Sequence, residues 1–563
     1  MTFLGIIEDR HLEQVPGTVI LDVEGTQLGG SPASSDPGAN IGSHIKYGTG
    51  KASRLVLVPQ PSNDPNDPLN WSTIKKFTIV AVACFGTVLF AAVNGPLLNA
   101  ALDDLVKEYD KSFTDITQIV SGYYLLVVGA SGPFVSAFSR KYGKRPVFLA
   151  SSIFGLISAI IGSANHSYHG LFAARLVSGL STCAYESVIL SLIGDVCFVH
   201  QRGLVASWVQ FFLGTVTNAS SIISGVIATR LGWHWLFYFM GLFSGLQTIG
   251  VYFFVPETTY HRDASYESDQ IGVPHLESND QYHPVSADGK VITIHMERRA
   301  TSPPELPPKK TYWEELAIFT GTHSDESLVQ LLMAPFGTCL NIAALWVVLF
   351  GGGFALFNVV TVYVVAQIFS APPYLLTAEG IGFLSTGPLI SGMLATLLIS
   401  FINDPFIAWA SHKNRGVYEP EYRLPLMFMA ATTGCGLIAF GHLTHSGSSY
   451  YACSAAQGLM IFGVTVVSIL TSNYILDAYR GLSNEVFIVS MMFKNFTFFG
   501  FSYFVNSWTA SAGTQVVFTV WGSTALGLMV LIPPMFFYGK VYRSYWFRHN
   551  LLKKFKIVTH AEF

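Results

Sequence analysis

The sequence predicts an all-α polytopic membrane protein, with twelve transmembrane helices arranged as two six-helix bundles. Half of its 563 residues are hydrophobic and 12% are charged, whereas a soluble protein carries about a quarter charged residues. Twelve apolar runs are long enough to cross a bilayer, because a hydrocarbon core about 30 Å thick takes about 20 helical residues. A short basic stretch follows the second apolar run of each half, at 140–146 and 412–416, which indicates two similar halves.

The first 75 residues precede the apolar runs. They are polar and rich in Gly, Pro, Ser and Asp. They lack the basic start and the longer apolar core of a cleavable signal peptide. We therefore expect residues 1–75 to form a cytoplasmic tail, with the first apolar run acting as an uncleaved insertion signal.

Residues 76–255 contain six apolar runs, which we predict to form the N-terminal bundle. Backbone amides have no water to bond to inside lipid, so each run is expected to be a helix. The runs are 77–98, 117–138, 146–164, 170–193, 203–229 and 233–255.

Residues 256–332 separate the two sets of runs and contain two Pro-Pro pairs. We predict a cytoplasmic linker that is partly disordered. Residues 333–540 form the predicted C-terminal bundle, and 541–563 form a cytoplasmic tail. The runs of this bundle are 340–369, 379–402, 425–443, 450–476, 485–508 and 515–538, and the first of them can begin earlier because Leu328–Phe336 is also apolar.

Lysine and arginine in the short loops predict the orientation of the chain. With the N-terminus in the cytoplasm, nine basic residues fall in cytoplasmic loops and three in external loops. The nine are Arg140, Lys141, Lys144, Arg145, Arg202, Lys413, Arg415, Arg423 and Arg480, and the three are Lys107, Lys111 and Arg230. This bias places both termini in the cytoplasm.

The sequence contains no motif that indicates an enzyme or an ATP-driven pump. Gly48–Lys51 resembles part of a phosphate-binding loop, but the earlier glycine and the following Ser or Thr are missing. The six cysteines lie in or beside apolar runs without metal-ligand spacing, so we expect no metal, no cofactor and no disulfide framework. A net charge of −3 gives no indication of a nucleic-acid partner.

The loop 140–146 reads Arg-Lys-Tyr-Gly-Lys-Arg-Pro. It resembles the loop between spans two and three of the major facilitator superfamily, whose pattern is Gly-x-x-x-Asp-Arg-x-Gly-Arg-Arg/Lys. Ser136 stands here in place of the first glycine, and Arg140 in place of the acid. The basic side chains can hold a helix end against carboxylates or helix carbonyls, or they can serve only as a topology signal. The gating candidates in this loop are Arg140, Lys141, Gly143, Lys144 and Arg145.

Further segments resemble the fungal drug:proton antiporter-like branch of that superfamily, in the same order. They are 64–72, 232–235, 256–258, 414–425, 473–479 and 494–495. The usual Asp-Trp pair of the eighth span is Ala408-Trp409 here, and Asp404, one helical turn earlier, is a candidate replacement for the missing acid. The fifth span lacks the Gly-Pro signature of antiporters, although Asn218 in it is a candidate to face a cavity.

The fourth run carries two intramembrane charges. Arg175, Ser178, Thr182 and Glu186 are spaced by three or four residues, so they share one helix face. A charge in mid-bilayer is costly unless it faces a cavity or a partner. We predict that Glu186 faces a cavity, with pairing inside the bundle as the alternative. Arg175 begins an Arg-x-x-x-Gly pattern that the resemblance links to proton coupling.

Other polar residues of the runs complete the list of candidates. Asn358 and Tyr474 are expected either to bind the solute and protons or to make packing hydrogen bonds. Asp477 ends the tenth run and Lys494 lies inside the eleventh, and we predict an ion pair between these two gating candidates.

The resemblance implies a carrier that works by alternating access around a site near the bilayer mid-plane. The activity that the resemblance implies first is proton-coupled efflux of drugs, toxins or secondary metabolites. The carrier is expected to be a monomer in the plasma membrane. The partners it implies are a small-molecule substrate, a proton as coupling ion and the lipid bilayer. The alternatives are an uptake permease for a nutrient or an organic cation such as a polyamine, and a transporter-like receptor.

Overall fold

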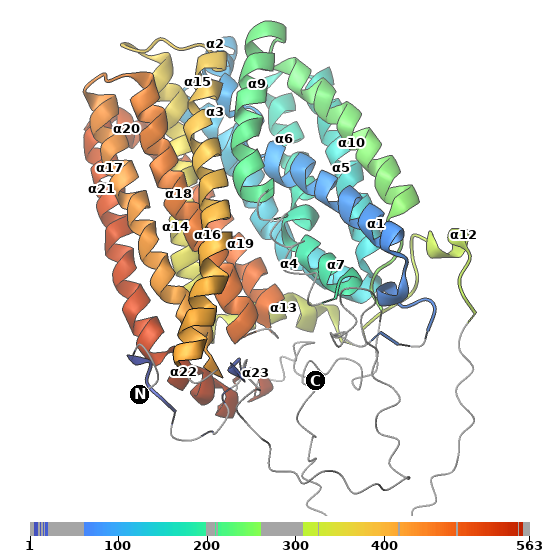
Figure 1. Cartoon of the computed structure of the whole chain (residues 1–563). Helices are drawn as coiled ribbons and strands as arrows, with labels where there is room; N and C mark the ends of the chain where they lie inside the picture. Colours follow the sequence, from blue (N-terminus) through green and yellow to red (C-terminus); the bar gives the residue numbers. More distant parts are fainter. Residues whose placement is uncertain are drawn as a thin grey trace, which may run out of the picture.

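The computed structural model contains two helix bundles that stand side by side (Figure 1). It describes residues 61–198, 212–260 and 308–554, apart from 63, 325, 415–416, 480–481 and 550. It also describes Val209 and, near the N-terminus, residues 5–9, 12, 15 and 17–20. The predictions for Arg202, Arg415, Arg480 and most of the linker therefore lie outside the described residues.

The N-terminal bundle consists of long helices with short π-helical segments. Its elements are η3 (Pro68–Asn70), α1 (Thr73–Gly86), η4 (Thr87–Val93), η5 (Asn99–Ala101), α2 (Leu102–Tyr109), α3 (Phe113–Thr117), η6 (Gln118–Gly122), α4 (Tyr123–Tyr142), α5 (Lys144–Ala164), α6 (Tyr168–Ser187), α7 (Ile189–Val196), η7 (Phe212–Val216), α9 (Thr217–Leu231) and α10 (His234–Phe254). The segments η4, η6 and η7 are π-helical and continue neighbouring α-helices.

The C-terminal bundle follows two short helices, α12 (Tyr312–Glu315) and α13 (Leu328–Thr338). Its elements are α14 (Ile342–Ser370), α15 (Ala378–Leu384), α16 (Thr386–Lys413), η8 (Pro420–Ala430), α17 (Ala431–His445), α18 (Tyr450–Ala478), α19 (Ser483–Ser502), α20 (Val505–Ala512), α21 (Thr514–Leu528), η10 (Met529–Leu531), α22 (Ile532–Arg548) and α23 (Leu551–Lys554). A two-stranded antiparallel sheet joins β1 (Val19–Ile20) to β2 (Val417–Tyr418).

The helices agree closely with the predicted twelve-span membrane fold. Ten helical stretches of the described residues are long and apolar enough to cross a membrane, and an eleventh is α19 with α20, bent by 50°. The remaining predicted run, 203–229, is described at Val209 and from Phe212 onward, where it forms η7 and α9. The seventh span does not begin earlier, because α13 is a separate helix that ends before α14.

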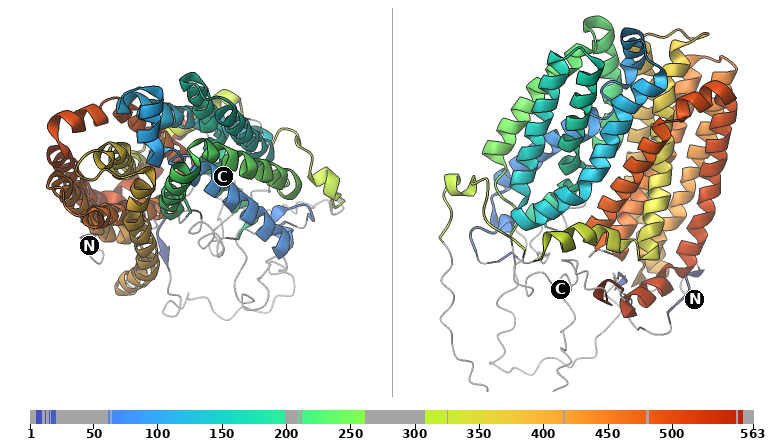
Figure 2. Two further views of the ribbon diagram at one scale, coloured as in Figure 1. Left: turned by 90° about the horizontal axis from the view of Figure 1, so that it is seen from above. Right: turned by 180° about the vertical axis from the view of Figure 1, so that it is seen from behind.

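We name the two ends of the molecule by the linker. The linker end holds the end of α10, α12 and α13, at the bottom of Figure 1, and the far end holds α2 and α20. Figure 2, seen from behind, shows the two bundles next to each other with α13 lying across the linker end. There α13 contacts α4 of one bundle and α19 of the other.

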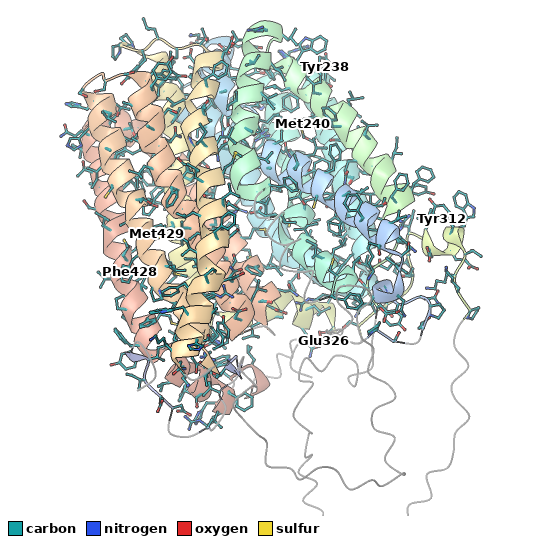
Figure 3. All side chains as sticks on the ribbon, in the orientation of Figure 1. Tyr238, Met240, Tyr312, Glu326, Phe428 and Met429 are labelled. Carbon is teal, nitrogen blue, oxygen red and sulfur yellow. The ribbon has the colours of Figure 1, made fainter. Side chains whose placement is uncertain are left out.

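The outer faces of the bundles are apolar. Tyr238 is 50% exposed and Phe428 is 49% exposed, and both point outward (Figure 3). Exposed apolar side chains on a long helix suit a lipid environment rather than water. The buried polar side chains that remain inside the bundles are therefore the place to look for function.

Candidate functional site in the seam between the bundles

We call the interface between the two bundles the seam. Small residues of α4 lie in it. Added Cβ atoms at Gly129 and Gly132 would meet Asn495 and Met491 of α19, which shows how closely the two helices pack. On the other side of the molecule, Gly225 of α9 lies against Gly382 of α15 in the same way. Glycine permits such backbone contacts between helices in a membrane.

An ion pair crosses the seam away from the ends of the two membrane spans that carry it. Glu186 of α6 pairs with Lys494 of α19, and their side chains are 17% and 28% exposed. The pair thus joins the two bundles, in an environment that is neither dry nor fully solvated. Of the two predicted environments of Glu186, a cavity or a partner inside the bundle, the structure shows a third: a partner in the opposite bundle.

Arg175 is fully buried about three helical turns from Glu186 on α6, and it has no carboxylate partner among the described residues. Its guanidinium donates to the carbonyl of Val120 (2.7 Å), to the carbonyl and side chain of Asn94 (2.9 and 3.4 Å) and to the carbonyl of Gly95 (3.1 Å). It also lies over the ring of Tyr124, 4.5 Å from the centroid. These acceptors belong to η6 and to the turn after η4, so Arg175 holds both π-helical segments in place.

Tyr124 connects Arg175 to the rest of the shared face of α6. Its hydroxyl lies 2.8 Å from the hydroxyl of Thr182, which donates to the carbonyl of Phe90 at 2.8 Å. Arg175, Thr182 and Glu186, whose spacing predicts one helix face, therefore contact η4, α4, η6 or α19. Sequence reasoning did not identify Tyr124 as part of this set, because a tyrosine in an apolar run carries no distinguishing signal.

The other candidates lie apart from the ion pair in the contacts that the structure gives. Asn218 on α9 is half-buried, and Asn358 on α14 has a side-chain oxygen without a hydrogen-bond partner in the described part of the chain. Tyr474 is buried against Trp346, with ring centroids 6.2 Å apart, and its hydroxyl is likewise unpartnered. Asn495, next to Lys494, was not predicted, and both polar atoms of its buried side chain lack a described partner.

At the linker end, the basic loop after α4 contacts both bundles. Arg140 pairs with Glu485 at the start of α19, and this carboxylate is only 2% exposed. Lys141 donates to the carbonyl of Glu326 at 2.8 Å, just before α13. Arg140, which stands where the family pattern has an acid, thus pairs with an acid of the opposite bundle. Glu485 was missed because its run already contained the more conspicuous Lys494.

The remaining residues of this loop bind to the N-terminal bundle and to the end of α12. Lys144 pairs with Asp195 near the end of α7, and Arg145 donates to the carbonyls of Tyr252 (2.8 Å) and Leu316 (3.0 Å). Glu257 accepts from the backbone amides of both Lys144 (3.0 Å) and Arg145 (3.1 Å). A carboxylate at the N-terminus of α5 is favourable because the unpaired amides and the helix dipole attract it.

Gly143 makes the reversal between α4 and α5 with φ +97° and ψ 162°. Gly232, between α9 and α10, has nearly the same conformation, φ +94° and ψ 153°. The two sites differ in their surroundings. A Cβ at Gly143 would overlap the Glu257 carboxylate, whereas one at Gly232 would meet nothing within 4 Å.

We predict that Gly143→Ala lowers the thermal unfolding midpoint more than Gly232→Ala does. Both substitutions place an L-residue in a strained conformation that costs about 1–3 kcal/mol, but only Gly143→Ala also displaces Glu257 from the N-terminus of α5. A fluorescence-based thermal shift of purified protein measures the difference. Equal shifts for the two variants would show that Glu257 does not depend on the glycine.

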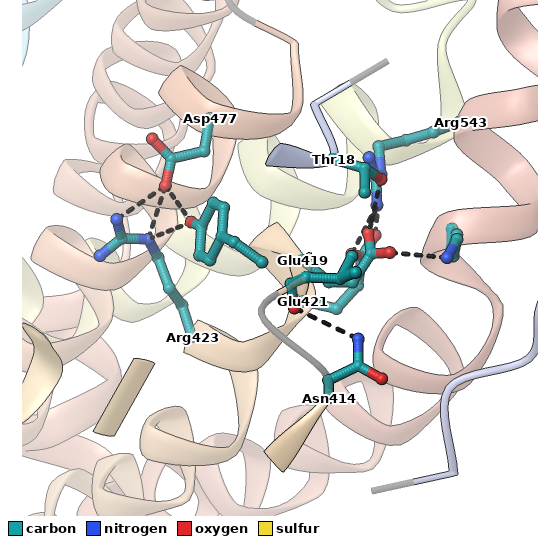
Figure 4. A network of polar contacts seen from close by, with 10 residues as sticks. Thr18, Asn414, Glu419, Glu421, Arg423, Asp477 and Arg543 are labelled. Atoms are coloured by element: carbon teal, nitrogen blue, oxygen red, sulfur yellow. Dashed lines mark hydrogen bonds and ion pairs between the residues drawn. The ribbon is translucent and has the colours of Figure 1, made fainter. Parts of the chain in front are cut away.

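In the second half, the predicted ion pair between Asp477 and Lys494 is wrong. Asp477, at the end of α18, pairs with Arg423 at 2.7 Å and accepts from the hydroxyl of Tyr418 (Figure 4). Asp404 is exposed on α16, where Asn403 donates to it at 3.0 Å, and it pairs with no basic side chain in the described ranges. Asp404 therefore does not take the place of the missing acid in this conformation.

The far end also joins the bundles, but mostly through neutral contacts. Tyr123 and Tyr503 meet hydroxyl to hydroxyl at 3.0 Å, and Asn506 donates to Thr117 at 3.0 Å. The exposed pair of Arg230 and Glu379 is longer, at 3.4 Å. An exposed ion pair of this kind contributes little to stability.

A cavity of about 470 Å³ opens at the far end between α2, α9 and the segment that leads into α15. Its wall carries the carboxylates of Asp103 and Asp104 and the ammonium group of Lys107. Partial desolvation and the neighbouring Asp103 charge raise the pKa of Asp104. The cavity thus has an excess of negative charge.

Comparisons with known proteins agree on one family. The sequence profile of the Major Facilitator Superfamily matches residues 80–495. The chain is 24% identical to an uncharacterized MFS-type transporter of Schizosaccharomyces pombe, over 95% of this chain and 94% of the relative. It is also 24% identical to the MFS-type efflux pump MFS2 of Trichophyton rubrum, over 94% of this chain and 82% of the relative. A D-xylose–proton symporter of known structure superimposes with a TM-score of 0.53 and 14% identity, covering 82% of this chain and 97% of the symporter.

Proposed function

The chain belongs to the Major Facilitator Superfamily, whose members are membrane transporters and not enzymes, and on that premise we propose that it exports a small organic compound in exchange for protons. The efflux pump of Trichophyton rubrum, which aligns with nearly the whole chain, supports export. We further propose that the carrier lies in the plasma membrane with both termini in the cytoplasm, and the distribution of basic residues among the loops supports that orientation.

The observation that carries this proposal is the ion pair between Glu186 and Lys494. It joins the two bundles where alternating access requires them to move against each other. A proton bound to Glu186 would remove the attraction to Lys494 and so release the contact across the seam. Protonation of Glu186 would thereby couple the proton gradient to the movement of the bundles.

Transport in reconstituted vesicles tests the proposal. Protein in liposomes with an imposed pH gradient is supplied with a panel of fluorescent organic compounds, and quenching or accumulation is followed. We expect protons that move down their gradient across the liposome membrane to drive the compound across it in the opposite direction. An ionophore that dissipates the proton gradient should stop this movement of the compound. Transport that is unaffected by the ionophore would contradict proton coupling.

The excess of carboxylates in the far-end cavity favours a second candidate, uptake of an organic cation such as a polyamine. Asp103 and Asp104 would raise the local concentration of cations at the predicted external mouth of the seam. The direction of flux separates the two candidates in the same vesicles. Movement of a labelled polyamine together with protons would support uptake, and movement of organic compounds against protons would support export.

A further inference from the structure

The N-terminal segment lies against the C-terminal bundle, although in sequence it leads into the N-terminal bundle. Its strand β1 pairs antiparallel with β2, with Val19 opposite Tyr418 and Ile20 opposite Val417. Figure 1 shows this strand at the linker end, next to α22. An extended segment that adds a strand to an exposed edge is a common mode of peptide recognition. We call the described residues between 5 and 20 the strap.

Two further anchors fix the strap to α22. The amide of Ile7 donates to the carbonyl of Phe537 at 3.1 Å, and Ser544 donates its hydroxyl hydrogen to Asp9 at 2.6 Å. The side chains of Ile6 and Val15 are buried, with 0% and 4% exposure. The strap is therefore held by backbone pairing, a side-chain hydrogen bond and apolar burial, all on elements of one bundle.

The strap covers a cluster of four charged side chains (Figure 4). Arg543 lies 2.8 Å from both Glu419 and Glu421, and Lys540 lies 2.6 Å from Glu419. The side chains of Glu419, Glu421 and Arg543 are at most 1% exposed. Buried charges of this kind persist only when their remaining hydrogen-bonding capacity is satisfied. The hydroxyl of Thr18 supplies one such bond, to Glu419 at 2.8 Å.

Gly17 shows that the strap and the surface fit each other closely. Its φ of +87° is one that L-residues rarely adopt. A Cβ at this position would lie 3.0 Å from Nη1 of Arg543 and 3.1 Å from the carbonyl oxygen of Asp477. A glycine followed by a hydroxyl residue thus matches both the shape and the charge of the surface.

We propose that the surface formed by β2, the end of α18 and α22 is a peptide-binding site, and that the chain's own N-terminal segment is its ligand. The site recognises an extended peptide with a glycine and a hydroxyl residue before the strand. The bound strap seals the cluster of Glu419, Glu421, Lys540 and Arg543 from water, and its displacement opens that cluster at the linker end.

Peptide binding to a truncated chain tests the site. A fluorescent peptide of residues 1–22 is titrated into purified full chain and into a chain that lacks these residues, with fluorescence anisotropy as the readout. We expect saturable binding to the truncated chain and at least about tenfold weaker binding to the full chain, whose site is occupied. The peptide with Thr18→Val should bind about tenfold more weakly, the effect of losing a hydrogen bond to a charged group. Equal binding to both chains, or no binding to a folded truncated chain, would overturn the proposal.

Disulfide cross-linking tests the same contact without truncation, in case the shortened chain does not fold. In a variant whose six native cysteines are replaced, Ile20→Cys with Val417→Cys should form a cross-link under mild oxidation. Ile20→Cys with Ser446→Cys, at the far end, is the matched control and should not. Adding Gly17→Val should lower the yield of the first cross-link severalfold, because the larger side chain prevents the strap from packing against Arg543 and Asp477. An unchanged yield with Gly17→Val, or no cross-link in the parent pair, would refute docking.

Discussion

Reversing the charges of Glu186 and Lys494 together should restore much of the transport that is lost when either charge is reversed alone. Glu186→Lys leaves two ammonium groups facing each other across the seam, and Lys494→Glu leaves two carboxylates. Like charges at this distance repel in a partly desolvated site, whereas the double variant recreates an opposite-charge pair between α6 and α19. Initial transport rates in vesicles, corrected for the amount of folded protein, measure the recovery.

The expected size follows from the environment of the pair. Removing one partner of a fully buried pair costs about 3–5 kcal/mol, and a fully exposed pair is worth about 0–1 kcal/mol. With side chains 17% and 28% exposed, the Glu186–Lys494 pair falls between these limits. We expect single reversals to slow transport by about tenfold or more, since about 1.4 kcal/mol corresponds to a factor of ten.

A neutral substitution of Glu186 distinguishes its role in the ion pair with Lys494 from its role in proton coupling. Glu186→Gln should fold normally but transport slowly, because the amide can hydrogen-bond to Lys494 but cannot exchange a proton. The exposed pair of Arg230 and Glu379 provides the matched control, and Glu379→Gln should leave the rate unchanged. If Glu186→Gln retained pH-dependent transport at the wild-type rate, Glu186 would have no part in coupling.

Simple geometry could have excluded the pairing of Lys494 with Asp477. Lys494 lies eleven residues after Ser483, the start of α19 at the linker end, which places it about 16 Å along the helix. Glu186 lies ten residues before Val196, the end of α7, so it sits at about the same depth. Asp477, one residue before the end of α18, lies too near the linker end to meet Lys494. The prediction is wrong because Lys494 lies deeper in its span than a contact with Asp477 allows.

The membrane fold could be predicted because it depends on the composition and length of each apolar run, which can be read from neighbouring residues. The ionic partners of Arg140, Lys144 and Arg543 could not be predicted, because those partners come from elements remote in sequence. Arg543 follows the last predicted run, 515–538, and its two buried carboxylate partners, Glu419 and Glu421, are brought to it by the packing of α22 against η8. The position of the strap could not be predicted either, since a polar composition near a terminus predicts no contact with a particular surface.

Replacing Arg175 should damage folding more than any change of a single exposed charge. Arg175→Met leaves the carbonyls of Val120, Asn94 and Gly95 without their donor inside the bundle. Each unsatisfied buried acceptor costs about 1–3 kcal/mol, so we expect a large loss of monodisperse protein and of thermal stability. Arg175→Lys keeps the charge but not the planar set of donors that reaches three carbonyls, and it should rescue little. Size-exclusion profiles and thermal unfolding of the purified variants measure both effects.

Two control variants show whether the loss of stability is specific to Arg175. Tyr124→Phe keeps the ring beneath the guanidinium and removes only the hydroxyl near Thr182, so it should be far milder than Arg175→Met. Arg230→Met removes an arginine whose side chain is 69% exposed and should be almost neutral for stability. The resemblance to proton-coupled carriers implies a different role, in which Arg175 acts during transport. An Arg175→Met protein that unfolds at the wild-type temperature but does not transport would favour that role, because a residue that only braces η4 and η6 cannot be lost without loss of stability.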